Sequence, residues 1–246
     1  MNNPPKFFGI LLVYKQAKLV ENIYYLLPKG VFDEVIIFDD ASGDGIEKVA
    51  EKLDLPIFIQ PKNLGYGGNI KYSLKKCLEL GADYMVEIHG DGQYGTEGII
   101  PGLEKMKQGS DLIIGSRLYD FFQPLRDKMP PLTYAADIGL SFIECLVLQL
   151  PFADLHAGFR IYSKKLVQTL DFAHTANDDL FSFQAIAMAK FFGLRIGKVP
   201  VRCYYTKEHT SITLKRASIY AFQTFGVLFL YILALLGFKI KLFQNK

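Results

Sequence analysis

Strand-length apolar runs alternate with segments of helical spacing through the first half of the chain. The predicted strands are residues 7–13, 34–38, 56–59, 82–88 and 111–114, and the predicted helices are residues 17–27, 46–53, 69–80 and 96–107. Strands that alternate with helices form a mostly parallel sheet with helices on both faces. The predicted fold class is therefore α/β with a Rossmann-like sheet.

The second half of the chain departs from this alternation beyond Arg117. It contains a loop rich in Pro, Arg, Lys and aromatic residues at 119–131, an apolar helix at 134–150, a strand at 155–162, a helix at 180–192 and a strand at 194–204. With 246 residues, half of them apolar, the chain is long enough for one α/β domain, or for a domain with an appendage.

The charge and the cysteine content narrow the function classes. A net charge of +3 without a long basic run in the body of the chain gives no support for nucleic-acid binding. Cys77, Cys145 and Cys203 are widely spaced and odd in number, which predicts reduced thiols in the core of a cytosolic protein.

The C-terminal segment has a composition of its own. The 22 residues between Arg216 and Lys239 carry no charge, and as a helix they would extend about 33 Å, enough to cross a bilayer core. The strictly apolar part, residues 225–238, has only 14 residues, which also fits an interfacial or core helix. We expect a main domain over residues 1–211, followed over residues 212–246 by a membrane-associated or single-pass apolar helix and a basic tail.

Polar residues gather where the predicted strands end. Asp39 and Asp40 close the second strand, residues 89–91 follow the fourth, and residues 115–117 follow the fifth. Ligands of parallel sheets bind beyond the carboxyl ends of the strands. These clusters therefore predict a ligand-binding site at one edge of the sheet.

The cluster after the fourth strand has the spacing of a cation site. His89, Asp91 and Gln93 alternate with Gly90 and Gly92, which allow a tight turn and a close approach to a ligand. A carboxylate, an amide oxygen and an imidazole that converge on one point suit a divalent cation holding a phosphate-bearing substrate. A polar loop capped by glycines is the alternative.

Two further segments could bind a nucleotide. Asp39 or Asp40 could accept hydrogen bonds from a base or from ribose hydroxyls, whereas Ser42 and Asp44 are expected to cap the next helix. Residues 63–69 are rich in glycine and precede a helix, so their backbone N–H groups could face an anion. A simple turn into the helix is the alternative for this segment.

Together, these motifs resemble the family 2 glycosyltransferases with a GT-A fold, closest to the branch of polyprenyl-phosphate sugar synthases such as dolichol-phosphate mannosyltransferase. The matching segments, in chain order, are residues 39–45, 63–69, 89–94, 115–117, 157–162 and 197–201. The resemblance extends over residues 7–205. Each motif is modest alone, but six of them in this order and in this strand context are specific.

The resemblance implies a role for each matched residue. Asp39 and Asp40 match the pair that holds the base and ribose of the nucleotide. Asp91 matches the last carboxylate of the family's DxD metal motif, followed by Gln93, and Arg117 matches an arginine that faces the acceptor phosphate. The implied catalytic residues are Asp91 and Arg117, the nucleotide-sugar-binding residues are Asp39, Asp40, Gly67, Asn69, Gly90 and Arg202, and the metal ligands are Asp91, Gln93 and His89.

Three positions depart from the family's pattern. The first strand ends in Tyr14-Lys15-Gln16 instead of a Tyr-Asn-Glu-like turn, and Gln184 stands where relatives often have Glu. His89 replaces the first carboxylate of the metal motif, so one protein carboxylate remains for the cation. The substrate pyrophosphate would supply the other ligands, as is common for Mg²⁺.

The implied activity is a metal-dependent, inverting transfer of a sugar from a nucleoside-diphosphate sugar to a lipid-linked, polyprenyl-phosphate-like acceptor. Mg²⁺ or Mn²⁺ would be the cofactor, the site would lie at the cytoplasmic face of a membrane, and no oligomeric state is implied. Arg126 could help Arg117 hold the acceptor phosphate, and Phe121, Phe122 and Met129 in the aromatic loop could enter the membrane surface.

Two alternatives stay open. An alcohol acceptor, as in polysaccharide or lipopolysaccharide synthesis, would require a carboxylate base, for which Asp154, Asp178 and Asp179 are the candidates. A non-catalytic nucleotide-sugar-binding subunit would explain the presence of His89 in the metal motif.

Overall fold

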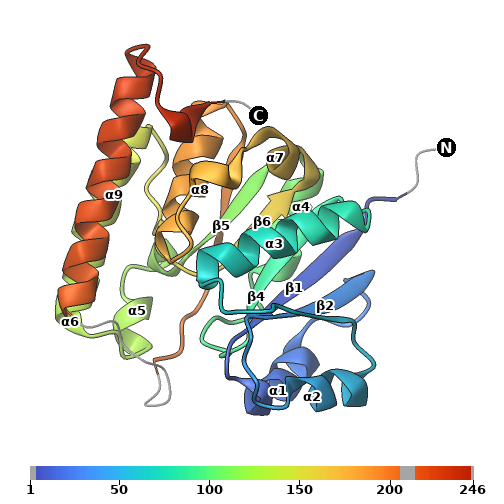
Figure 1. Cartoon of the computed structure of the whole chain (residues 1–246). Coiled ribbons are helices and arrows are strands. Elements are labelled where there is room, and N and C mark those ends of the chain that lie inside the picture. The colour runs from blue at the N-terminus through green and yellow to red at the C-terminus, as the bar shows by residue number, and fades with distance from the viewer. Residues whose placement is uncertain (1–3, 206–213, 245–246) are drawn as a thin grey trace.

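A seven-stranded sheet forms the centre of the molecule (Figure 1). The structure, a computed structural model, describes residues 4–205 and 214–244. The strands are β1 (Phe7–Val13), β2 (Glu34–Asp39), β3 (Ile57–Ile59), β4 (Tyr84–His89), β5 (Leu112–Ser116), β6 (Arg160–Ser163) and β7 (Ile196–Pro200). Their spatial order is β3-β2-β1-β4-β6-β5-β7, and within the described residues only β6 runs against the others. The predicted mostly parallel sheet is confirmed.

Helices cover both faces of this sheet, as the sequence predicts. They are α1 (Ala17–Leu26), α2 (Ile46–Leu53), α3 (Tyr66–Glu79), α4 (Ile99–Lys107), α5 (Gln123–Arg126), α6 (Pro131–Leu148), α7 (Lys164–Thr169), α8 (Leu180–Phe191) and α9 (Leu214–Leu235). Alternate residues of a strand point to opposite faces. Ile10 and Leu12 of β1 therefore pack with α3, α7 and α8, whereas Leu11 and Val13 pack with α1, α2 and α4.

The last predicted strands are shorter than expected. Residues 155–157, predicted as the start of a strand, instead turn around the carboxylate of Asp154, which accepts hydrogen bonds from the backbone N–H groups of His156 and Ala157. The segment after β7 changes partner, and Cys203 forms an isolated antiparallel bridge with Tyr94. Neither a local side-chain hydrogen bond nor a change of strand partner alters the spacing of apolar residues. The hydrophobic periodicity of the sequence could therefore not predict where these strands begin and end.

The aromatic loop predicted at residues 119–131 contains the short helix α5. Phe121 and Phe122 are exposed, but Met129 is buried at 3% exposure. The expectation that Met129 enters a membrane surface is therefore wrong, because its side chain belongs to the core.

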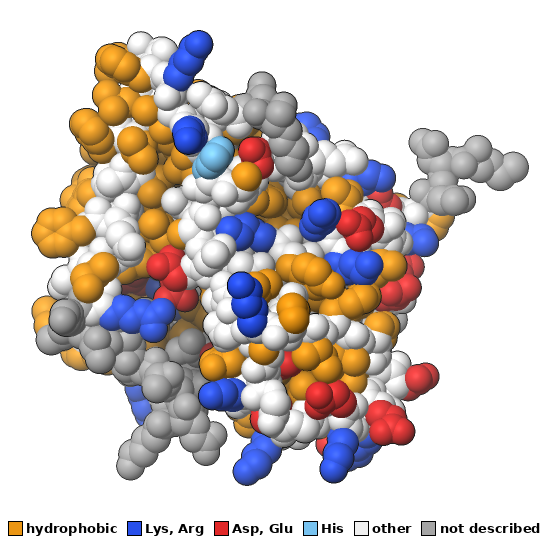
Figure 2. All heavy atoms as spheres, in the orientation of Figure 1, with side chains coloured by type: hydrophobic (Ala, Val, Ile, Leu, Met, Phe, Trp, Pro, Cys, Tyr) orange, Lys and Arg blue, Asp and Glu red, His pale blue; other side chains and the backbone are white. Residues whose placement is uncertain are grey.

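The predicted C-terminal apolar helix is confirmed as α9, which packs along α8 and α6 at one edge of the molecule (Figure 1). Hydrophobic side chains are prominent on the surface at this edge (Figure 2). By length and composition alone, α6 and residues 216–235 of α9 could each cross a membrane. The expected boundary between residues 211 and 212 lies outside the described residues.

Candidate active site

The register of the sheet brings the predicted polar clusters to one edge. Asp39 at the end of β2 lies opposite Val13 of β1, and His89 at the end of β4 lies opposite Leu12 of β1. Since neighbouring strands lie about 4.8 Å apart, the ends of β2 and β4 are separated by roughly 10 Å. A ligand of nucleotide size can therefore contact both.

Asp39 presents an unused hydrogen-bond acceptor. Its side chain is 1% exposed, and Oδ2 accepts a hydrogen bond from the backbone N–H of Ser42 at 2.9 Å. The other oxygen, Oδ1, is buried and has no hydrogen-bond partner. Buried polar atoms are nearly always paired, so this oxygen marks a position where a ligand donor would be stabilised.

Asp40 organises the glycine-rich turn. Its two carboxylate oxygens accept hydrogen bonds from the backbone N–H groups of Leu64 (2.6 Å) and Gly65 (3.0 Å). Burial raises the pKa of Asp40 above its usual value, and these two hydrogen bonds offset part of that rise. Asp40 therefore connects the end of β2 to the segment that begins α3.

The glycines of residues 63–69 allow close packing against the segment before α8. A Cβ atom at Gly67 would lie 2.7 Å from the carbonyl oxygen of Asp178 and 2.8 Å from that of Ala176. The Asn69 side chain donates to the carbonyl of Phe38 at 3.0 Å. Protein groups thus surround Gly67 and Asn69, and their role in nucleotide binding stays a prediction.

Ser42 and Asp44 do not cap the helix that follows them, so that expectation is wrong. Ser42 Oγ accepts a hydrogen bond from the N–H of Lys15 at 2.7 Å, and Asp44 Oδ2 accepts one from the N–H of Ala17 at 2.9 Å. Ala17 is the first residue of α1. The two side chains stabilise the turn after β1 because the sheet places that turn beside the end of β2.

The turn after β4 presents Asp91 at the same edge. Asp91 is partly exposed, and its Oδ1 accepts a hydrogen bond from the N–H of Gln93 at 2.9 Å. Gly90 fits closely beneath β1, since its N–H donates to the carbonyl of Leu12 and a Cβ atom would lie 2.6 Å from that oxygen. This packing does not test the prediction that Gly90 contributes to nucleotide-sugar binding.

The side chain of His89 is directed into the interior of the protein, where it pairs with Glu87. Its Nε2 lies 2.9 Å from Oε1 of Glu87, a fully buried carboxylate that also accepts hydrogen bonds from the hydroxyls of Tyr66 and Tyr162. Burial lowers the pKa of His89, but the hydrogen bond and charge of Glu87 outweigh it and raise the pKa overall. Glu87 was not predicted as a site residue, although it lies two residues before His89 on the same side of β4.

Arg117 is enclosed by two carboxylates and a tyrosine. Its Nε donates to Asp154 at 2.5 Å, its Nη2 to Asp137 at 2.6 Å, and its Nη1 to the hydroxyl of Tyr205 at 2.7 Å. Asp154 is fully buried, whereas Asp137 retains some exposure. The structure thus brings Asp154, a predicted candidate base, directly onto the predicted acceptor arginine.

Asp137 was missed by the sequence analysis. It lies on α6, where burial and the neighbouring Asp154 raise its pKa from 3.8 to about 6. Glu144 is two helical turns further along α6, fully buried, and forms an ion pair of 2.8 Å with His156. Two carboxylates seven residues apart lie on one face of a helix, a signal that the overall apolar composition of α6 concealed.

The other two arginines predicted to bind a substrate, Arg126 and Arg202, are also paired with carboxylates. Arg202 donates to both oxygens of Asp127 and lies over the ring of Tyr204, and Arg126 donates to Asp120 at 2.8 Å. Arg202 reaches this edge because the chain after β7 pairs with the turn after β4, where the N–H of Gly95 donates to its carbonyl.

The remaining candidate bases have structural partners. Asp178 Oδ1 accepts a hydrogen bond from the N–H of Leu180, and Asp179 forms an ion pair of 2.6 Å with Arg216. Gln184, which stands where relatives often have Glu, accepts a hydrogen bond from the N–H of Ala176.

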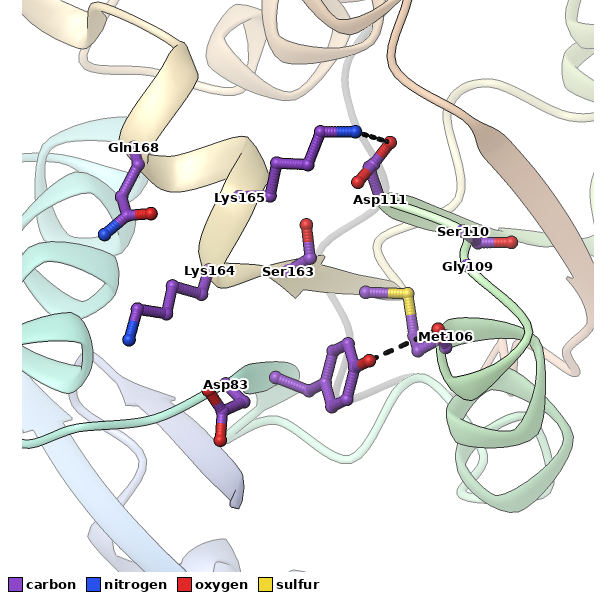
Figure 3. A pocket seen from close by; sticks show the side chains of 10 residues that line it. Asp83, Met106, Gly109, Ser110, Asp111, Ser163, Lys164, Lys165 and Gln168 are labelled. Carbon is purple, nitrogen blue, oxygen red and sulfur yellow. Dashed lines mark hydrogen bonds and ion pairs between the residues drawn. The ribbon is translucent and has the colours of Figure 1, made fainter. Parts of the chain in front are cut away.

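A cavity of about 330 Å³ lies elsewhere, at the opposite edge of the sheet (Figure 3). It is lined by the starts of β4 and β5 and by the end of β6, including Tyr84, Asp111 and Ser163. Lys165 crosses it to form an ion pair of 3.2 Å with Asp111. None of the predicted site residues lines this cavity.

The family follows from comparison with known proteins. The model of glycosyl transferase family 2 matches residues 15–171. The chain belongs to glycosyltransferase family 2. It is therefore a glycosyltransferase, and the resemblance noted in the sequence is confirmed.

Individual relatives refine this assignment. The UDP-N-acetylglucosamine–dolichyl-phosphate N-acetylglucosaminyltransferase of Methanococcus voltae is 29% identical over 217 residues, which cover 80% of this chain and 85% of that protein. Glycosyltransferase AglJ of Haloferax volcanii is 23% identical over 206 residues, 81% of this chain and 63% of that protein.

Solved structures share the fold. Glucosyl-3-phosphoglycerate synthase from Mycobacterium tuberculosis, crystallised with Mn²⁺, uridine diphosphate and phosphoglyceric acid, superposes with a TM-score of 0.65 at 16% identity. The superposition covers 92% of this chain and 78% of that one. The GT-A fold predicted from the motifs is thereby confirmed.

Proposed function

We propose that this glycosyltransferase moves a sugar, with inversion, from a nucleoside-diphosphate sugar to a lipid-linked phosphate acceptor. The observation that carries the proposal is the place of Arg117: it lies at the carboxyl edge of the sheet and contacts α6, a helix with an apolar outer face. A phosphate on an apolar chain would find a cation and an apolar surface together there. The dolichyl-phosphate acceptor of the Methanococcus voltae relative supports the same acceptor class.

The donor nucleotide is assigned to the ends of β2 and β4. The unpaired Oδ1 of Asp39 can accept a hydrogen bond from a base N–H or a ribose hydroxyl. Asp40 fixes the turn that closes this side through Leu64 and Gly65. The uridine diphosphate of the structural neighbour and the UDP-sugar of the Methanococcus voltae relative support a uridine nucleotide.

A divalent cation, Mg²⁺ or Mn²⁺, fits part of the predicted ligand set. Asp91 and Gln93 offer a carboxylate and an amide oxygen on one exposed turn, which are the hard donors that both ions prefer. The described residues contain no group of three His, Cys, Asp or Glu side chains that could hold a metal ion. Asp91 and Gln93 would therefore hold the cation with the diphosphate, where it would neutralise the charge of the leaving group, and His89 would support the turn through Glu87.

The transfer itself needs little from the protein beyond position and charge. A phosphate oxygen of the acceptor is already anionic at neutral pH, so it attacks the anomeric carbon without a general base. The bond from that carbon to the diphosphate oxygen breaks on the opposite face, and the nucleoside diphosphate leaves with the electron pair. Arg117 would bind the acceptor phosphate bidentately, exchanging Asp137 for it while Asp154 keeps the guanidinium in place.

An alcohol acceptor is the second candidate, and Asp137 is the observation that favours it. A carboxylate with a pKa of about 6 is suited to accept a proton near neutral pH. Asp137 lies beside Arg117 and would then act as the base, a role that Asp154 cannot take while both of its oxygens are bonded to Arg117 and to backbone N–H groups.

We place the enzyme at the cytoplasmic face of a membrane, with α9 in contact with the lipid. Nucleotide sugars are cytoplasmic compounds, and the free cysteines Cys77, Cys145 and Cys203 are consistent with a reducing compartment.

The test is a donor and acceptor screen with the purified full chain. Nucleotide release is measured with several UDP-sugars, Mg²⁺ or Mn²⁺, and either a polyprenyl phosphate or a water-soluble alcohol acceptor, and NMR of the product gives the anomeric configuration. Turnover only with polyprenyl phosphate supports the first proposal, and turnover only with the alcohol supports the second. Retention of the donor's anomeric configuration would refute the inverting mechanism.

Asp91→Asn is predicted to lower turnover by roughly 1,000-fold or more, because it removes the carboxylate that would hold the cation. The matched control is Asp54→Asn, since Asp54 lies in a left-handed conformation at the end of α2 that asparagine also adopts. Thermal unfolding is expected to be unchanged in both variants. Near-normal turnover of Asp91→Asn would contradict the metal assignment.

A further inference from the structure

The outer face of α6 is apolar over its whole length. Its exposed hydrophobic side chains are Leu132, Phe142, Ile143 and Leu146, with exposed fractions of 42–69%. Ala135, Ala136 and Gly139 complete the exposed face between them. Spacings of three and four residues place all of these positions on one side of the helix, and none of them is charged.

The outer face of α9 repeats this pattern. Its exposed hydrophobic side chains within the described part are Ile219, Phe222, Phe225, Phe229, Ile232 and Leu235, and Leu236 and Phe238 follow the helix. Phe222 is 77% exposed, the largest fraction among them. α9 packs beside α6, so the two helices lie together at one edge of the molecule (Figure 1).

The inner faces of both helices are committed to the protein. Asp137, Ser141 and Glu144 of α6 point inward, where Asp137 holds Arg117 and Glu144 pairs with His156. The inner side of α9 packs on α8 and α6 through Val227, Leu228 and Tyr231 among others. A membrane crossing would expose the two carboxylates of α6 to hydrocarbon, which is strongly unfavourable.

We propose that α6 and α9 form one docking surface for a lipid leaflet, in which both helices lie along the membrane plane and neither crosses it. The apolar outer faces would enter the boundary between head groups and acyl chains. This inference deepens the membrane contact of the proposed function and rests on it, but it assigns the contact to two helices instead of one.

The basic residues just beyond α9 favour a lipid membrane as the partner of this docking surface. The chain has no acidic residue after Glu208, whereas Lys239 and Lys241 are exposed just beyond α9. Basic residues at the end of an apolar helix complement anionic head groups. No charged side chain is exposed on α6 or over residues 217–238, whereas the rim of a protein interface is usually polar.

The geometry connects this surface to the site. Since a helix is about 10 Å in diameter, Arg117 on the inner side of α6 would lie roughly one helix diameter from the leaflet. That places the arginine within reach of a phosphate whose acyl or prenyl chain stays in the membrane.

Tryptophan reporters test the orientation directly, because the chain contains no tryptophan of its own. Single variants of the full chain carry Leu146→Trp on α6, or Phe222→Trp, Phe229→Trp or Leu236→Trp on the α9 side. Each is mixed with phosphatidylcholine–phosphatidylglycerol vesicles that carry bromine at shallow or deep acyl positions and contain no donor or acceptor, so the result is independent of catalysis.

The expected result is quenching of all four reporters, strongest by shallow bromine. A crossing helix would instead give deep quenching at Phe229→Trp and shallow quenching at Phe222→Trp and Leu236→Trp, which would overturn the proposal. Quenching on α9 without quenching at Leu146→Trp would exclude α6 from the surface. Absence of vesicle binding together with a dimer in light scattering would assign these faces to a second copy of the chain.

Vesicle co-sedimentation supplies the matched control. Leu146→Gln and Phe229→Gln are each expected to lower the partition constant roughly 10-fold, the effect of removing one large apolar side chain from the lipid. Leu26→Gln on α1 removes an equally exposed leucine, at 68% exposure, and is expected to leave the constant unchanged. Equal effects of all three substitutions would refute a defined surface.

Discussion

On the proposed donor side of the site, the carboxylates of Asp39, Asp40 and Asp91 accept hydrogen bonds from backbone N–H groups. On the acceptor side, the cation Arg117 is held by the carboxylate side chains of Asp137 and Asp154. Backbone donors are fixed by the strands and turns that carry them. Side-chain partners can exchange, because a rotamer change releases them.

On the proposed assignment, this difference means that the two substrates would meet different kinds of site. The proposed donor side has an unpaired acceptor atom, the buried Oδ1 of Asp39, to which a nucleotide donor would bind without displacing a protein partner. On the proposed acceptor side, a phosphate would have to replace a carboxylate at Arg117. We therefore expect donor affinity and acceptor affinity to respond to different substitutions.

Arg117→Lys gives the largest expected effect on this comparison. Lysine keeps the charge but loses the planar fork, so kcat/KM for the polyprenyl phosphate is expected to fall about 100-fold, equivalent to about 3 kcal/mol. The Kd for UDP, measured by calorimetry, is expected to change less than about 3-fold, because Arg117 does not contact the donor side. Arg195→Lys is the control, since Arg195 is exposed, belongs to no predicted site and donates to the backbone carbonyl of Gln108. Equal losses for donor and acceptor would break the separation of the two sides.

Asp137→Asn tests the carboxylate that a phosphate would replace at Arg117. The measured quantity is the pH dependence of the free energy of unfolding. The folded pKa of about 6 lies above the ordinary value of 3.8, so the contribution of Asp137 to stability is fully present below about pH 4 and is lost as the pH rises through 6. Relative to Asp137→Asn, the wild-type free energy of unfolding is expected to fall by about 3 kcal/mol over that range. Urea unfolding at several pH values measures it, and a difference that does not vary with pH would contradict the raised pKa.

Asp39→Asn tests the unpaired acceptor atom on the proposed donor side. The amide can still accept from Ser42, but it then presents an N–H₂ group where Oδ1 meets the ligand. We expect the Kd for UDP to rise about 30-fold, equivalent to about 2 kcal/mol, with acceptor KM unchanged. An unchanged Kd would show that Asp39 is structural.

Gly67→Ala is expected to have the smallest effect, on stability and donor binding together. The added methyl group would meet backbone oxygens at 2.7–2.8 Å, so the free energy of unfolding is expected to fall by about 1–2 kcal/mol. Gly139→Ala on α6 is the control, since nothing lies within 4 Å of its Cβ position and alanine favours the helix. A loss of stability in the control but not in Gly67→Ala would contradict the packing described for the turn.

The framework of the fold was predictable because strands and helices have distinct apolar periods. The predicted strand at residues 7–13 coincides with β1, and the predicted helix at residues 46–53 coincides with α2. The strand predicted at residues 155–162 was largely wrong, since the carboxylate of Asp154 folds the chain around itself. Such local hydrogen bonds do not change the spacing of apolar residues along the sequence.

The gathering of the predicted polar residues at one edge of the sheet was predictable from the sequence, but their contact partners were not, and their roles stay predictions. The ends of β2, β4 and β5 were identified correctly, because polar residues interrupt apolar strands there. The contacts of Arg117 with Asp137, and of His89 with Glu87, depend on which elements the topology brings together. Spacing along the chain cannot report a contact between α6 and the end of β5.

The reversed strand β6 has a consequence for how such enzymes can diversify. Because β6 runs against its neighbours, the chain that leaves the sheet at Ser116 re-enters it at Arg160 on the same edge. Residues 117–159 thus leave and re-enter the sheet on one side, and they contain Arg117, Asp137 and Asp154 but none of Asp39, Asp40 and Asp91. If the proposed assignment of the two sides holds, a chimera that exchanges residues 117–159 between relatives is expected to keep its donor nucleotide and to change its acceptor.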